Sequence, residues 1–142
     1  MKHGSAQLLL IVSLTIGAAA FLAAKTDTTQ QRGARLYQNY CQRCHGTDGM
    51  GSVNISRNPI WSKEPIELAK VIAFGARGPS ATGKEFHRAM PPAPYNDQEI
   101  ALVTVYAMQT IGRRDVSITT EDVRNARRQH LDSVRRKIKR GR

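Results

Sequence analysis

Both cysteines of the chain stand three positions apart, and a histidine directly follows the second, as Cys41-x-x-Cys44-His45. A pair with this spacing can form a disulfide or a redox couple, supply half of a zinc site, or attach a haem together with the histidine. Residues at i and i+3 lie on one side of a helical turn. Both thiols can therefore form thioethers with the two vinyl groups of one porphyrin, and His45 can ligate its iron.

The surroundings of this motif favour haem over the alternatives. A redox pair of the thioredoxin type needs a β-α-β pattern, which the sequence lacks. Zinc needs four ligands, so His87 or His130 would have to come from distant segments. The chain has 142 residues, 40% of them hydrophobic, which suits one small domain, and such a domain often needs a cofactor to complete its core. We therefore predict one covalently bound haem c with its iron.

The iron then needs a sixth ligand or an open position, and Met90 is the best candidate. Two prolines follow it, and they hold the chain in an extended conformation that can fix a thioether in place. His87 is the main rival. Met50 comes only five residues after His45 and lies on the same side of the haem, while Met108 falls in a helical pattern and is expected in the core. We predict His45 and Met90 as the metal ligands.

Trp61, the only tryptophan, lies in a predicted loop. Its indole N–H can donate to a haem propionate if the ring packs beside the cofactor. The alternative is core packing alone. We include Trp61 among the candidate cofactor-binding residues, with Cys41, Cys44, His45 and Met90.

An uncharged run occupies residues 4–24, after the basic start Met-Lys-His. A basic start, an apolar centre and small residues near a cleavage site are typical of a secretory signal peptide. About 20 apolar residues can also span a bilayer, so an uncleaved membrane anchor is the alternative. Either way, we expect the folded part to lie outside the cytoplasm, periplasmic or exported, and either free or attached to the membrane through this run.

The rest of the chain has helical patterns and no useful β alternation. Apolar residues recur at spacings of three and four after Asp97, with Asn96 as N-cap and Gly112 as the stop. A second apolar pattern after Glu64 ends at Gly75. Segments rich in glycine and proline separate these helices and are predicted to wrap round a cofactor. The fold class predicted is all-α.

The last segment, residues 113–142, carries eleven Lys and Arg against four Asp and Glu. Thr119 or Thr120 can cap a helix there, followed by a thin apolar stripe comprising Val123, Ala126, Leu131, Val134 and Ile138. The stripe is expected to lie against the haem domain, a partner or a membrane surface. From Arg135 onward we expect a solvated, frayed end. Nucleic acid is not an expected partner of an exported protein, despite the pI near 10.4.

Residues 32–112 resemble the class I cytochromes c, small all-helical monohaem electron carriers. "RGARLYQNYCQRCHGTDGMG" is similar to the family's N-terminal helix and haem-binding segment, with Gly33 and Tyr37 as contact positions. "NDQEIALVTVYAMQTIG" is similar to its C-terminal helix, in which Tyr106 crosses against the first helix. "AMPPAP" matches its ligand loop, which implies Met90 opposite His45. "VSITTEDVRNARRQ" resembles the tail of cytochrome subunits that accompany dehydrogenases and reductases.

The resemblance implies a small class I cytochrome c fold round one covalently attached haem. Three parts are expected: a signal peptide or anchor at 1–24, a haem domain at 25–112 and a basic, partly helical extension at 113–142. With both axial positions filled, the iron can change oxidation state but cannot readily bind a substrate. We therefore predict an electron carrier, not an enzyme, that docks briefly on redox partners with acidic surfaces. The alternatives are a haem c subunit of a larger dehydrogenase, oxidase or reductase complex, and an open-site haem enzyme or sensor.

Overall fold

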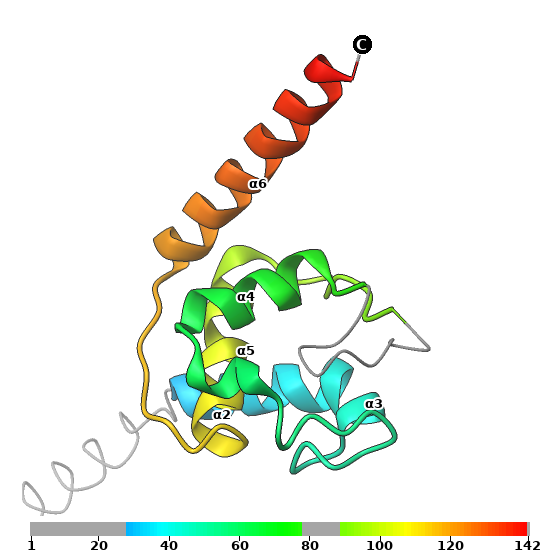
Figure 1. Cartoon of the computed structure of the whole chain (residues 1–142). Coiled ribbons are helices and arrows are strands. Elements are labelled where there is room, and N and C mark those ends of the chain that lie inside the picture. The colour runs from blue at the N-terminus through cyan, green and yellow to red at the C-terminus, as the bar shows by residue number, and fades with distance from the viewer. Residues whose placement is uncertain (1–27, 78–88, 142) are drawn as a thin grey trace, which may run out of the picture.

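The computed structural model describes residues 28–77 and 89–141 (Figure 1). In chain order the elements are α2 (Thr29–Leu36), the π-helical turn η1 (Tyr37–Cys41), α3 (Gln42–His45), the 3-10 turn η2 (Pro59–Ser62), α4 (Pro65–Phe74), α5 (Asp97–Thr110) and α6 (Thr120–Arg140). These described residues contain no β-strand, and a single antiparallel bridge pairs Ala76 with Met90. The all-α prediction is confirmed.

The predicted signal peptide or anchor, residues 4–24, lies outside the described residues. Among the helices that the structure describes, none is both long and apolar enough to cross a membrane.

The N-terminal helical segment runs without a break through α2, η1 and α3. A capping box starts it: the Thr28 hydroxyl accepts from the Gln31 N–H, and the Gln31 side chain accepts from the Thr28 N–H. The π-helical turn ends at Cys41; such turns are frequent at functional sites. Gly46, at φ +70°, ends α3 directly after His45. All three residues of the Cys-x-x-Cys-His motif therefore lie at the C-terminal end of this long helical segment.

α2 crosses α5 at a very close contact. A Cβ added at Gly33 would lie 2.6 Å from the carbonyl oxygen of Leu102 and 2.7 Å from Cβ of Tyr106. The rings of Tyr37 and Tyr106 lie one turn further along, with their centroids 5.5 Å apart. The prediction that Gly33, Tyr37 and Tyr106 form the contact between the first and last helices of the haem domain is confirmed.

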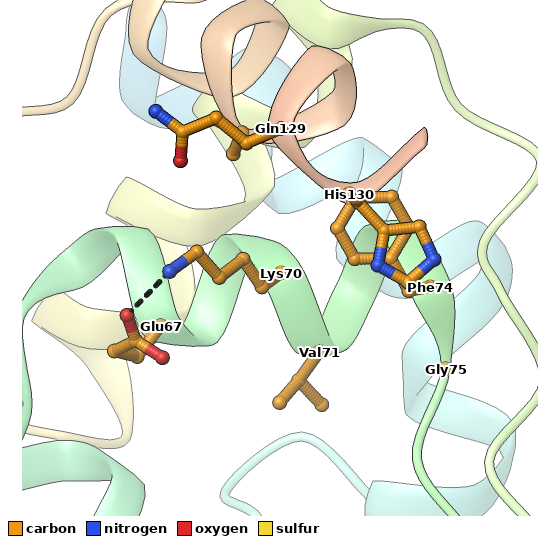
Figure 2. A pocket seen from close by; sticks show the side chains of 8 residues that line it. Glu67, Lys70, Val71, Phe74, Gly75, Gln129 and His130 are labelled. Atoms are coloured by element: carbon orange, nitrogen blue, oxygen red, sulfur yellow. Dashed lines mark hydrogen bonds and ion pairs between the residues drawn. The ribbon is translucent and has the colours of Figure 1, made fainter. Parts of the chain in front are cut away.

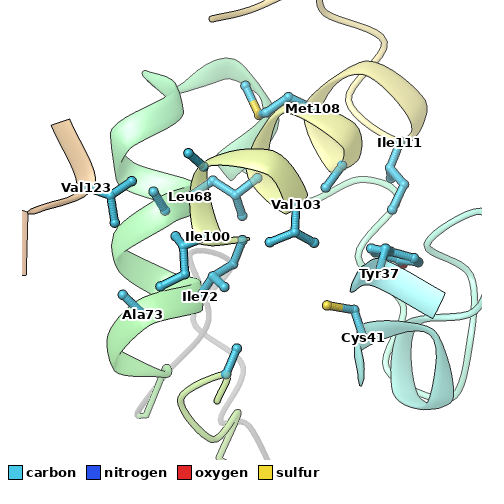
Figure 3. Close-up of a cluster of buried hydrophobic side chains, with 14 of the residues drawn as sticks. Tyr37, Cys41, Leu68, Ile72, Ala73, Ile100, Val103, Met108, Ile111 and Val123 are labelled. Carbon is cyan, nitrogen blue, oxygen red and sulfur yellow. The ribbon is translucent and has the colours of Figure 1, made fainter. Parts of the chain in front are cut away.

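The core lies between η1, α4 and α5 (Figure 3). α5 begins at the predicted N-cap Asn96, which forms a capping box with Glu99. Its inward side chains are fully buried, and Met108, expected in the core, is among them with no exposed surface. α4 adds Leu68 and Ile72 and ends at Gly75, as predicted. Cys41 lies at the edge of the same cluster, so the core continues directly to the cysteine motif.

α6 is preceded by the N-cap Thr119, which forms a capping box with Asp122. Val123 and Ala126 are buried, on the part of α6 that packs on α4 and α5. The prediction of a frayed end from Arg135 onward is wrong, because the helix continues to Arg140. Basic residues in the last turn interact favourably with the negative end of the helix dipole and support this extension. Their side chains are exposed, as the solvated part of that prediction requires.

Candidate functional site

The two thiols of the motif differ in their surroundings. Cys41 is buried and Cys44 is exposed, and both are free. Burial raises the pKa of Cys41 to about 11, although the nearby Arg43 opposes the shift. A thiol that stays protonated at neutral pH is a poor nucleophile and a poor metal ligand as it stands. This environment disfavours a reactive redox couple at Cys41.

His45 is oriented by the chain that follows it. Its Nδ1 lies 3.0 Å from the carbonyl oxygen of Val53. Because a carbonyl oxygen only accepts, Nδ1 carries the proton in this hydrogen bond, which leaves the lone pair on Nε2. A backbone carbonyl on one ring nitrogen is the usual support for a histidine whose other nitrogen binds a metal. His45 thus has the tautomer that an iron ligand requires.

The segment after His45 folds back tightly on the motif. The N–H of Gly51 donates to the His45 carbonyl, and the N–H of Val53 donates to the Cys44 carbonyl, each at 2.9 Å. A Cβ at Gly51 would lie 2.5 Å from the Gly46 nitrogen and 2.6 Å from the Cys44 carbonyl oxygen. Only glycine permits this approach, which brings the Val53 carbonyl to the imidazole.

Met90 is half-buried and packs against the core cluster that includes Cys41. Its backbone is fixed against the end of α4, because Met90 and Ala76 exchange two hydrogen bonds of 3.0 Å. Gly75, at φ +76°, makes room for this pairing, since a Cβ there would lie 2.4 Å from the Met90 carbonyl oxygen. The N–H of Ala93 then donates to the carbonyl of Ile72. The methionine is thus held by backbone pairing on both its own amide and its own carbonyl.

Two tyrosines tie the chain after Met90 to the helical segment that carries the cysteines. The Tyr40 hydroxyl donates to the Pro92 carbonyl at 3.0 Å, and the Tyr95 hydroxyl donates to the Leu36 carbonyl at 2.7 Å. Their rings meet edge to face with centroids 5.8 Å apart. Burial raises the pKa of Tyr95, so its hydroxyl stays a donor at neutral pH. We call Tyr40 and Tyr95 the tyrosine clamp.

The donor set fits a haem c: two free thiols one helical turn apart, an imidazole with a free Nε2 lone pair, and a thioether held on a separate segment. Residues 28–106, which contain all of these groups, match the family model of cytochrome c oxidase, cbb3-type, subunit III. The chain belongs to this family. It is a family of class I c-type cytochromes, which implies haem c with its iron and haem-based electron transfer. No curated protein matches the chain.

In this cytochrome Trp61 has a different partner from the one predicted. Its N–H donates to the carbonyl of Ile55, and its ring is buried. The Arg114 guanidinium in turn donates to the carbonyls of Trp61 and Lys63, at 2.8 and 2.7 Å. The ring therefore packs in the core with its one N–H on a backbone carbonyl, and the hydrogen bond to a propionate stays a prediction. A backbone carbonyl six residues away supplied the acceptor that the sequence could not reveal.

Three other residues considered as ligands, His87, His130 and Met50, are not among these donor groups. His87 lies outside the described residues. His130 stacks on Phe74 with ring centroids 4.0 Å apart, in a groove between α4 and α6 (Figure 2). Met50 is 61% exposed. Within residues 28–77 and 89–141, no three His, Cys, Asp or Glu side chains gather to hold a metal ion, so a zinc site built with His130 has no support.

Sequence reasoning missed the tyrosine clamp. Tyr40 directly precedes Cys41 and Tyr95 follows Met90 by five residues, so their positions beside the two ligand segments were a usable signal. No signal in the sequence indicated the hydrogen-bond acceptors of the two hydroxyls, because both acceptors are backbone carbonyls more than fifty residues away along the chain.

Proposed function

We propose that this cytochrome is a one-electron carrier whose single haem is attached through Cys41 and Cys44 and ligated by His45 and Met90. The observation that carries the proposal is the fixation of Met90, whose backbone pairs with Ala76 while the tyrosine clamp holds the following segment. A thioether whose backbone is fixed in this way would be suited to keep a coordination position of the iron closed. A closed position favours electron transfer over substrate binding.

Each of the four residues has a separate role in binding the haem. Cys41 and Cys44 would hold the haem through thioethers, each formed by adding the sulfur and hydrogen of one thiol across one vinyl double bond, which needs no oxidant. His45 offers Nε2 to the iron, while the Val53 carbonyl holds the Nδ1 proton and the orientation of the ring. Met90 offers a neutral sulfur, which favours the ferrous state. The bound haem supplies the one-electron change of its iron.

The charge of the chain supports brief docking on acidic redox partners outside the cytoplasm. With a formal net charge of +11, it is attracted to acidic surfaces, which raises the association rate more than the affinity. The family itself is described as an oxidase subunit, and this favours a second candidate, a haem c subunit held in a larger complex. Purification from native membranes distinguishes the two candidates, because a subunit co-purifies with its complex and a free electron carrier does not.

The proposal is tested on the exported holoprotein by a redox titration and by ligand binding. We expect a single reversible one-electron step, a low-spin spectrum, and resistance to cyanide in the ferric form. Rapid cyanide binding with a high-spin ferric spectrum would contradict the closed site and favour an enzyme or a sensor.

A further inference from the structure

The two halves of α6 have different surroundings. In the first half, Val123 and Ala126 are buried. Arg127 holds this half in place, because its guanidinium donates to the Asp97 carboxylate at 2.5 Å and to the Tyr95 carbonyl at 2.9 Å. Beyond that point the helix leaves the bundle and projects away from it (Figure 1). We call residues 131–140 the projecting half.

The projecting half has an apolar face that nothing in the described structure covers. Leu131 is 63% exposed, Val134 38% and Ile138 59%. Seven residues are close to two helical turns, so Leu131 and Ile138 lie on one face with Val134 between them. Three large apolar side chains aligned on a projecting helix form a surface that favours burial.

Basic side chains surround this face. Residues 131–140 contain one Asp and five Lys or Arg, namely Arg135, Arg136, Lys137, Lys139 and Arg140. At 100° per residue, Arg135 and Lys137 flank the stripe on its two sides and Arg136 and Arg140 lie behind it. All five side chains are exposed.

This distribution identifies the kind of surface that fits. A second copy of the chain would bring five positive charges against five, which opposes association. Headgroups of an anionic bilayer present negative charge on every side of a helix that sinks to their depth, and flanking Lys and Arg reach them while apolar side chains enter the acyl boundary. We propose that the projecting half of α6 binds an anionic lipid surface through Leu131, Val134 and Ile138.

Binding can be followed at the helix itself, because the only natural tryptophan, Trp61, is buried. Full-length holoprotein carrying Val134→Trp is mixed with vesicles of phosphatidylcholine alone or with added phosphatidylglycerol. We expect a blue shift and quenching by brominated lipid only with the anionic vesicles, lost in high salt. Ser133→Trp, on the adjacent polar face, is the matched reporter and should be quenched less.

The apolar contribution is tested by Leu131→Gln with Ile138→Gln, which should weaken binding to anionic vesicles by tenfold or more. Met50→Gln removes an equally exposed apolar side chain from a different segment and should change nothing. All variants keep the same N-terminal segment, so a difference in vesicle binding between the double variant and the parent is caused by α6. Equal binding of the double variant and the Met50 variant would overturn the proposal. The proposal would also be overturned if the fluorescence of the Val134→Trp variant changed with neither type of vesicle. An acidic protein would then be the partner that covers the projecting half.

Discussion

The two ligand segments of the site are built in different ways. On the His45 side, the bonds that position the imidazole and its loop join residues within nine positions of one another, such as His45 with Val53 and Cys44 with Val53. On the Met90 side, the bonds join distant segments: Met90 with Ala76, and Tyr40 with Pro92, 52 positions away. The histidine side is thus a local structure, while the methionine side exists only when the tertiary fold is complete.

This difference implies an order of failure. Local opening in a protein requires less free energy than global unfolding, and it begins at a segment that only a few tertiary contacts hold in place. The Met90 segment depends on a bridge to Ala76 and on the tyrosine clamp, whereas His45 is on a capped, continuous helical segment. We therefore expect mild destabilisation to release the methionine first and to leave the histidine bound.

The largest effect should follow from replacing both Cys41 and Cys44 with alanine. This change removes the covalent attachment that both sides share. No haem should remain with the chain in a denaturing gel, and the fold should be lost because the cofactor completes a small core. Covalent haem in the double variant would contradict the assignment of the thioethers.

A smaller effect, confined to the methionine side, is expected for Gly75→Ala. An alanine at this position has to adopt φ +76°, and its Cβ would lie 2.4 Å from the Met90 carbonyl oxygen. With ψ 178°, Gly75 lies in a region of backbone conformation that is nearly restricted to glycine, and another residue there costs about 1–3 kcal/mol before the clash is added. The methionine-to-iron charge-transfer band should disappear at lower denaturant concentration than in the parent, while the haem stays attached.

Gly141→Ala is the control for Gly75→Ala, because a Cβ there meets its nearest neighbour at 3.5 Å. It should leave the band at its parental midpoint. If both glycine variants lose the band at the same denaturant concentration as the parent, the bridge at Ala76 does not hold the ligand.

The smallest effect should come from Tyr40→Phe, which removes the hydroxyl that donates to Pro92 and keeps the ring under Arg43. One hydrogen bond contributes about 0.5–1.5 kcal/mol. We expect the equilibrium between methionine-bound and methionine-released iron to shift toward release by about fivefold, measured by the same band during denaturant titration.

Tyr106→Phe serves as the matched control for the clamp. Its hydroxyl forms no hydrogen bond within the described structure, and its ring packs on Tyr37. The clamp would lose its assigned role if the two tyrosine variants behaved alike.

The same distinction explains what the sequence could predict. The Cys-x-x-Cys-His motif, the caps Asn96 and Thr119, and the stop at Gly75 are local patterns, and the structure has these caps and this stop in place. The close crossing at Gly33 required the family resemblance, because a glycine in a helix does not reveal its partner.

The misses involve acceptors that have no sequence signature. The hydroxyls of the tyrosine clamp and the indole N–H of Trp61 all donate to backbone carbonyls, which every residue has. Only the folded chain determines which carbonyl comes within reach. The helix continues beyond Arg135, where a frayed end was expected, and basic residues in its last turn stabilise the helix C-terminus.

Met90 as the sixth ligand is the central claim, and Met90→Ala tests it most directly. Removing the thioether should abolish the charge-transfer band, lower the reduction potential and allow cyanide or carbon monoxide to bind. His87 could replace the lost sulfur, so Met90→Ala combined with His87→Ala is measured beside the single variant, with Met50→Ala and Met108→Ala as controls that keep the band. If the parent already binds cyanide quickly and Met90→Ala changes neither spectrum nor potential, Met90 is not a ligand and the site is open.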